Sequence, residues 1–129
     1  MIAYQTVKKN MELYPDKPAV KDGNKVINWT EYGGLVKNII WNLNNKVSMD
    51  NISKAMIISE NRWELLIIYS ALATLKIPYT GVDYTSTIAQ KNHCFKALKP
   101  DLVICSKAFS KDISACEATV INIDKDFDR

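Results

Sequence analysis

The chain of 129 residues is 47% hydrophobic and 24% charged, and its 17 basic and 14 acidic residues give a net charge of +3. This balance is ordinary for a soluble globular protein, and the length suits one domain. Lys8-Lys9 is the only candidate for a basic stripe, so we expect neither a nucleic-acid partner nor a polybasic membrane anchor. No apolar run ending in small residues follows Met1, so we expect no secretory signal and a cytoplasmic protein.

The first expected elements are a surface helix and a β-hairpin. Apolar residues recur at helical spacing over residues 2–14, and Pro15 ends that helix because proline disfavours helical angles in the residue before it. Two β-prone segments, 19–21 and 26–29, flank the sequence Asp-Gly-Asn-Lys at 22–25. Asp-Gly favours the backbone angles of a tight turn, so the pattern predicts a hairpin.

A second helix is expected next, with Thr30 as its N-cap. Apolar residues then recur every three or four positions, at Tyr32, Leu35, Val36, Ile39, Ile40 and Leu43. Gly33 and Gly34 each cost this helix about 1 kcal/mol relative to alanine. We expect them to allow close packing against a neighbouring element, with a ligand contact as the alternative. The polar stretch 42–54 is expected to be a loop.

The stretch 55–83 is predicted to be the centre of the fold. It contains a β-prone run (Ala55–Ser59), an apolar segment (Trp63–Leu75) and a second β-prone run (Tyr79–Val82). A strand, a crossover helix and a second strand form a βαβ unit, whose strands should run parallel. The helix is apolar on nearly every side, so it must be covered on more than one face. It is too short for a bilayer, which needs about 20 residues, so we predict a core helix.

The remaining segments extend the same alternation. A turn with a capping hydroxyl at 84–87 precedes an amphipathic helix over 88–98, whose apolar face is expected to contain Ile88, Cys94, Phe95 and Leu98. Strands are predicted at 102–105 and 119–123, with a weakly helical segment at 106–116 between them. The fold class is therefore α/β: a layered lobe with a mainly parallel sheet plus an N-terminal helix and β-hairpin.

Residues with metal or redox chemistry are few. Cys94, Cys105 and Cys116 are an odd number at wide spacings, and His93 is the single histidine. His93 and its neighbour Cys94 diverge by about 100° on a helix, so they cannot easily bind one metal. We therefore expect three reduced thiols and a solvated or edge-packed histidine.

Recognisable catalytic patterns are also missing. The four glycines form no phosphate-binding motif. Glu60 and Glu64, at a helix start, are explained by a favourable interaction with the helix dipole. The acidic residues of the charged segment 124–129 are expected to be solvated; they are Asp124, Asp126 and Asp128. We therefore identify no catalytic, cofactor-binding or metal-binding residue.

Four segments, read in order, resemble the start of the adenylate-forming enzymes of the AMP-dependent synthetase and ligase superfamily. They are Tyr14-Pro15-Asp16-Lys17-Pro18-Ala19-Val20, Ile27-Asn28-Trp29-Thr30-Glu31-Tyr32, Ser59-Glu60-Asn61 and Pro78-Tyr79-Thr80-Gly81-Val82-Asp83. Gly81 replaces the usual proline, and Lys76 stands where glycine is common. Asp83 is typical of the amino-acid-activating branch, and the chain is similar to the opening of D-alanyl carrier protein ligases.

The resemblance implies an enzyme that activates a carboxylate, of an amino acid or another acyl acid, with ATP and Mg²⁺. The acyl-adenylate then passes its acyl group to the thiol of CoA or a carrier protein. The family's nucleotide-binding motifs and catalytic lysine follow the matched region, so none is transferred to this chain. Residues 1–129 are expected to be the truncated first lobe of the large N-terminal domain, inactive alone, with helix and hairpin at 1–29 and an α/β core at 30–129.

Two other hypotheses for this protein are not excluded by the sequence. A stand-alone, non-enzymatic α/β interaction module should fold cooperatively as a monodisperse species, whereas a lobe cut from a larger domain should expose an apolar face and self-associate. A small flavodoxin-like or receiver-like binding protein would need a phosphate loop after its first strand or an acidic cluster at its strand ends, and the sequence suggests neither.

Overall fold

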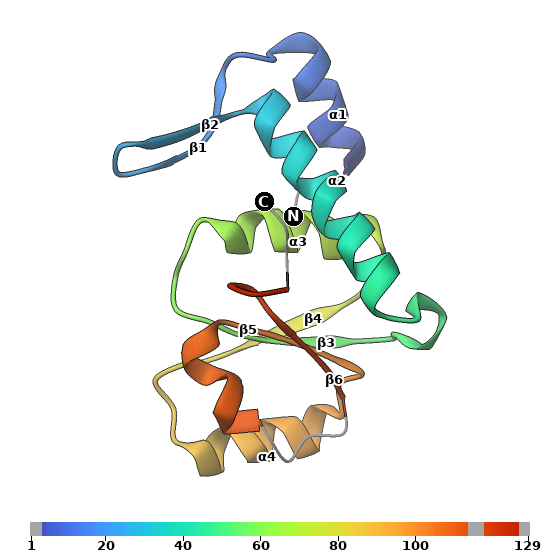
Figure 1. The fold of residues 1–129 in the computed structure, drawn as a ribbon, viewed down its shortest axis with the longest axis vertical. Coiled ribbons are helices and arrows are strands. Elements are labelled where there is room, and N and C mark those ends of the chain that lie inside the picture. Colours follow the sequence, from blue (N-terminus) through green and yellow to red (C-terminus); the bar gives the residue numbers. More distant parts are fainter. Residues whose placement is uncertain (1–3, 114–117, 127–129) are drawn as a thin grey trace.

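The structure is a computed structural model that describes residues 4–113 and 118–126. Its elements form layers, with the two N-terminal helices and the hairpin above a central helix, the parallel sheet beneath that helix, and a further helix on the opposite face of the sheet (Figure 1). The predicted α/β class is confirmed.

The N-terminal helix and hairpin are both present as predicted. Helix α1 spans Tyr4–Leu13, and strands β1 (Pro18–Asp22) and β2 (Lys25–Asn28) pair antiparallel. Asp22 pairs with Lys25, and Gly23 has a φ of 58°. A positive φ at the first central residue of a two-residue loop is the pattern of a type II′ turn, for which glycine is best suited.

Helix α2 (Trp29–Lys46) begins one residue before the predicted cap, so the assignment of Thr30 as N-cap is wrong. Asn28 is the cap: its side chain accepts a hydrogen bond from the Glu31 amide at 2.9 Å, and the Glu31 carboxylate accepts one from the Asn28 amide at 3.5 Å. The Thr30 hydroxyl instead donates to the Pro15 carbonyl at 3.2 Å. This capping box satisfies two amides at the helix start.

The prediction that a loop begins at Asn42 is also wrong, since α2 continues to Lys46. Asn42 is buried, and its side-chain amide donates to the Asn38 carbonyl one turn back at 2.9 Å. The polar group therefore finds a partner inside the helix and does not end it. A short 3₁₀ helix, η1 (Met49–Asn51), follows.

The two glycines of α2 have different surroundings. A Cβ at Gly33 would collide with the thioether of Met11 in α1, whereas a Cβ at Gly34 would meet no atom within 4 Å. The prediction of close helix packing is therefore confirmed at Gly33. Nothing packs closely at Gly34.

The central sheet has four parallel strands in the order β4-β3-β5-β6. They are β3 (Ala55–Ile58), β4 (Tyr79–Val82), β5 (Leu102–Cys105) and β6 (Thr119–Asn122). Helix α3 (Glu64–Thr74) connects β3 to β4, which confirms the parallel βαβ unit at the centre of the chain. Since β4 and β5 lie on opposite sides of β3, the strand order reverses between β3 and β5.

The two faces of the sheet are covered unequally. On the α3 side, one cluster of 19 buried residues joins the sheet to α1, α2 and the hairpin. The other face has a small cluster of four buried residues, Met56, Ile58, Val103 and Cys105, among those described. Helix α4 (Ile88–Leu98) and the 3₁₀ helix η2 (Lys107–Ile113) lie on this second side.

The predicted apolar face of α4 is partly wrong. Phe95 and Leu98 pack against the small cluster, but Ile88 is 57% exposed and Cys94 is also exposed. The buried residue of this helix is Lys91. Residues 91, 95 and 98 share one face by their i, i+4 and i+7 spacing, and this face points to the sheet.

Thr87 caps α4, as predicted, in a capping box with Gln90. The weakly helical segment predicted at 106–116 contains η2, and its residues 114–116 lie outside the described residues. In the described part of the chain, no helix combines the length and apolarity needed to cross a membrane.

Candidate functional site

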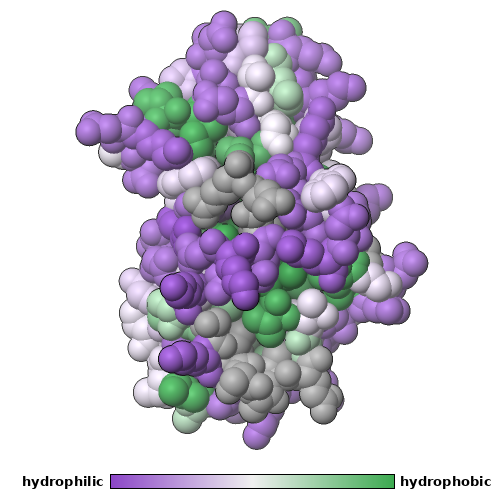
Figure 2. All heavy atoms as spheres, viewed as in Figure 1, coloured by the Kyte–Doolittle hydropathy of each residue, from purple (hydrophilic) through white to green (hydrophobic). Residues whose placement is uncertain are grey.

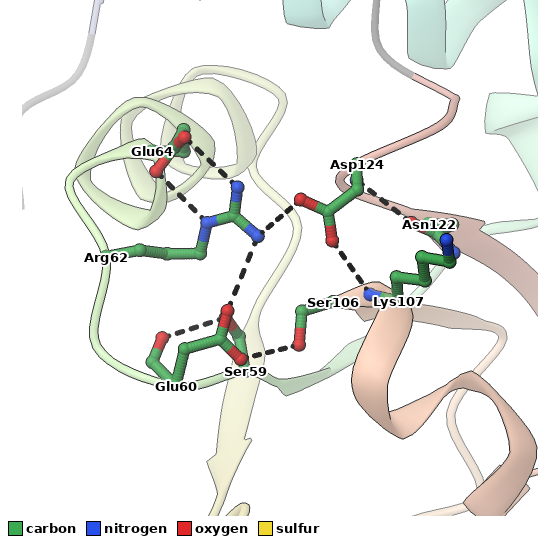
Figure 3. A network of polar contacts seen from close by, with 8 residues as sticks. All are labelled: Ser59, Glu60, Arg62, Glu64, Ser106, Lys107, Asn122 and Asp124. Carbon is green, nitrogen blue, oxygen red and sulfur yellow. Dashed lines mark hydrogen bonds and ion pairs between the residues drawn. The ribbon is translucent and has the colours of Figure 1, made fainter.

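Polar side chains meet where strands β3, β5 and β6 end, beside the point where the strand order reverses (Figure 3). Ligands of open α/β sheets usually bind at this carboxyl edge, so this is the place to look for a site. We call the group the edge network; its members are Ser59, Glu60, Arg62, Glu64, Ser106, Lys107, Asn122 and Asp124.

Arg62, in the loop between β3 and α3, is the centre of the edge network. Its guanidinium donates Nε and Nη2 to the two carboxylate oxygens of Glu64, each at 3.1 Å. Its Nη1 lies 2.8 Å from Oδ1 of Asp124 and 3.5 Å from Oε1 of Glu60. The bond to Glu64 contributes most to raising the pKa of Arg62 above its ordinary value, and Asp124 adds to it.

The carboxylates extend the edge network to the neighbouring strands. The second oxygen of Glu60 accepts a hydrogen bond from the Ser106 hydroxyl at 2.8 Å, directly after β5. The second oxygen of Asp124 accepts from the Lys107 amide at 2.8 Å. The Asp124 amide donates to the side-chain oxygen of Asn122, the last residue of β6, at 2.9 Å. The segments after three strands are thus joined through one arginine.

This arrangement suits a structural clamp better than a catalytic centre. Three carboxylates face one guanidinium, so the edge network has a net negative charge that would repel a phosphate. The Arg62 side chain is 16% exposed and already bonded to those carboxylates. Among the residues described, no three His, Cys, Asp or Glu side chains are placed to hold a metal. A shallow pocket beside the network is lined by Glu60, Ser106, Lys107, Ala108, Lys111 and Asp124.

The structure changes the interpretation of the acidic residues. Glu64 does lie in the first turn of α3, as the helix-dipole argument required, and its carboxylate also pairs with Arg62. Asp124 is exposed, as predicted, but its carboxylate also binds Arg62 and the Lys107 amide, which the sequence did not predict. Asp126 accepts from the Asn122 amide at 2.7 Å, so it is also part of the folded structure. Asp128 lies outside the described residues.

Sequence reasoning missed Arg62, Ser106 and Asp124 as a group. A usable signal existed, since each follows a predicted strand within a few residues. Carboxyl ends of parallel strands meet at one edge of a sheet, so polar residues after these strands could have been expected to lie together.

Among the described residues, the histidine and the two cysteines do not form a site. His93 and Cys94 are exposed on α4, whereas Cys105 is a buried thiol at the end of β5. Cys116 lies outside the described residues. Asp83 directly follows β4 at the start of a turn, where its carboxylate accepts hydrogen bonds from the amide and the hydroxyl of Thr85.

No protein-family model and no curated protein matches this sequence. Solved structures do match its fold. O-succinylbenzoate coenzyme A synthetase from Bacillus subtilis, in complex with ATP and magnesium ion, is 13% identical with a TM-score of 0.80; the match covers 97% of this chain and 33% of that one. Coronafacic acid ligase from Pectobacterium brasiliense is 19% identical with a TM-score of 0.79, covering 95% of this chain and 26% of that one.

A third match is a nonribosomal peptide synthetase, FmoA3, bound to α-methyl-L-serine-AMP. It is 14% identical with a TM-score of 0.79, and the match covers 99% of this chain and 14% of that one. The chain thus spans about a third or less of the length of these proteins. Nearly all of it has the fold of a part of the adenylate-forming ligases.

Proposed function

We propose that these residues are the first lobe of the large N-terminal domain of an adenylate-forming ligase. The complete enzyme would activate a carboxylate, of an amino acid or another acyl acid, with ATP. It would release pyrophosphate and transfer the acyl group from the adenylate to a thiol of CoA or a carrier protein. In this proposal the lobe alone is inactive, and it acts in the cytoplasm as a support for a site completed by other lobes.

The observation that carries this proposal is the extent of the structural match. A TM-score of 0.80 over 97% of the chain relates it to a ligase solved with ATP and magnesium. The sequence motifs at 14–20, 27–32, 59–61 and 78–83 support the same family in the same order.

The residues present do not fit ATP or Mg²⁺ by themselves. The glycines lie in the hairpin turn, inside α2 and inside β4, and none opens a helix after a strand. The carboxyl edge of the sheet is filled by the edge network, whose carboxylates would oppose a triphosphate. ATP and Mg²⁺ are therefore assigned to the complete enzyme, and no step of the reaction is assigned to this chain.

Exposed hydrophobic side chains are candidate contacts for such a partner lobe. Large hydrophobic side chains are exposed at several separate places, including Val26 on β2 at 50% and Leu66 on α3 at 48%. Figure 2 shows hydrophobic residues over the hairpin within a mostly hydrophilic face. We expect the rest of the synthetase to cover some of these positions, and the isolated lobe to self-associate through them.

The test is to follow the reading frame beyond Arg129 and to assay both forms. A longer product should contain a Ser/Thr/Gly-rich loop ending in lysine and should catalyse carboxylate-dependent exchange of pyrophosphate into ATP. The 129-residue chain should show neither exchange nor a thermal shift with ATP. A stop codon after Arg129, together with a monodisperse and cooperatively folding chain, would instead support a stand-alone interaction module. Exchange by the short chain itself would contradict the proposed supporting role.

A further inference from the structure

The connection from β5 to β6 is unusual in its backbone. Helix η2 is a 3₁₀ helix of seven residues, Lys107–Ile113. Runs of 3₁₀ helix beyond three or four residues are uncommon, because their hydrogen bonds have poorer geometry than those of an α-helix. The position of η2 must therefore depend strongly on contacts made by side chains and at its ends.

The first end of η2 is firmly attached to the sheet. The Ser106 amide donates to the Ile58 carbonyl at 3.1 Å, and the Ser106 hydroxyl donates to Glu60 at 2.8 Å. The Lys107 amide donates to Asp124 at 2.8 Å. Figure 3 shows these contacts at the start of the helix, within the edge network. This end is the base of η2.

Among the described residues, a charged pair and the Phe109 ring hold the rest of η2. Nζ of Lys91, in α4, lies 2.8 Å from Oδ2 of Asp112 and 4.8 Å from the centroid of the Phe109 ring. The Lys91 side chain is 4% exposed and that of Asp112 is 20% exposed. Phe109 also contacts the ring of Tyr84, with centroids 5.5 Å apart. Asp112 of η2 is thus the carboxylate in direct contact with this buried ammonium, which also acts electrostatically on Asp83.

The core beneath η2 is thin among the described residues. Phe109 packs against the small cluster formed by Met56, Ile58, Val103 and Cys105; these are four described buried residues, where the cluster on the other face has 19. Local opening is favoured where few buried apolar contacts hold a segment. Opening of η2 would uncover the part of the small cluster that Phe109 covers, while α4 and the larger cluster stay in place.

We propose that η2 is a flap that opens locally about its base at Ser106–Lys107, and that the Lys91–Asp112 ion pair is the latch that holds it closed. Lys107, Ala108 and Lys111 also form one wall of the shallow pocket beside the edge network. Opening of the flap would therefore change the shape of that pocket as well as uncover Cys105.

Labelling of the Cys105 thiol with a maleimide tests the proposal, since this side chain is fully buried in the closed structure. The other two thiols are first removed by Cys94→Ser and Cys116→Ser. Asp112→Asn leaves the Lys91 ammonium buried without its carboxylate, which strongly disfavours the closed form. We expect labelling to become about 10- to 100-fold faster. The rate should depend only weakly on urea, because local opening exposes little surface.

Two further variants separate the latch from general destabilisation. Asp50→Asn makes the same change at an exposed position of the other short 3₁₀ helix, η1, and should leave the labelling rate unchanged. Lys91→Met combined with Asp112→Leu replaces the ion pair by apolar groups, which can substitute for a buried pair, and should return labelling toward the parent rate. Acceleration by Asp50→Asn equal to that of Asp112→Asn would overturn the proposal.

Labelling of the Asp112→Asn protein with the full urea dependence of global unfolding, or at the parent rate, would also overturn it. If this variant does not fold, hydrogen exchange of the parent protein decides the question. The amides of residues 108–112 should then exchange faster than those of β3 (Ala55–Ile58), through an opening that spares the sheet. Equal protection of the two segments would refute a flap.

Discussion

Arg62→Met removes the guanidinium that pairs with three carboxylates in the edge network. Truncating one partner of a buried ion pair costs about 3–5 kcal/mol. The Glu64 side chain is 12% exposed, but those of Glu60 and Asp124 are 42% and 35% exposed, so solvent screening reduces the effect. We expect the free energy of unfolding to fall by about 2–3 kcal/mol and Tm by about 10 °C.

Urea and thermal unfolding followed by circular dichroism measure this change. Lys21→Met is the matched control, because it removes a positive charge from an exposed position of β1, and it should change stability by less than about 0.5 kcal/mol. If Arg62→Met were as mild as this control, the edge network would not join the three strand ends energetically. The view of it as a structural clamp would then be wrong.

Three further predictions concern helix packing, capping and pH. Gly34→Ala should raise the free energy of unfolding by about 0.5–1 kcal/mol. Gly33→Ala should have a free energy of unfolding about 1–2 kcal/mol lower than that of Gly34→Ala, measured by urea unfolding, because its new methyl group would collide with Met11 of α1. Equal effects of the two substitutions would contradict the packing. Asn28→Ala should cost about 1 kcal/mol in the same assay through loss of the α2 cap, and an unchanged midpoint would contradict the cap. Hydrogen bonds from the Ser53 hydroxyl and amide lower the pKa of Asp101 in the folded protein. The ionised Asp101 therefore stabilises the fold above the ordinary carboxyl pKa of about 3.9, and this stabilisation is lost as the pH falls through the lower pKa of the folded state. A carbon-detected NMR titration should show that depressed pKa, and Ser53→Ala should raise it; no change on that substitution would contradict the assignment.

Strands and helices were predictable because local patterns determine them. The apolar runs that form β3 and β5 are buried on both faces of the sheet, as such runs in parallel sheets usually are. The N-cap was harder to assign, since Asn28 and Thr30 are both good capping residues. In the structure the Thr30 hydroxyl donates to the carbonyl of Pro15, 15 positions earlier, and does not cap the helix. No local sequence pattern predicts that contact.

The charged groups of the interior could not be predicted for the same reason. A lysine inside a helix usually indicates the solvent side, yet Lys91 is buried because Asp112, 21 positions later, provides a carboxylate. Arg62 is likewise explained by Asp124, which follows three more strands of the chain. Such pairs follow from the topology of the sheet, and they can be expected only once the strand order is known.

The late position of Asp124 has a consequence for synthesis on the ribosome. The Ile123 amide donates to the Cys105 carbonyl at 2.8 Å, and the next residue provides the carboxylate for Arg62. A nascent chain that ends at β5 already contains both helices that pack on α3, but it lacks the residues after β6 that bond to Cys105 and Arg62 at the carboxyl edge of the sheet. Domains generally fold as units. Arg62 can pair at once with Glu64, two residues later, but the carboxylate of Asp124 is made only after more than sixty further residues, so the bond between the segments after β3 and β6 is among the last to form.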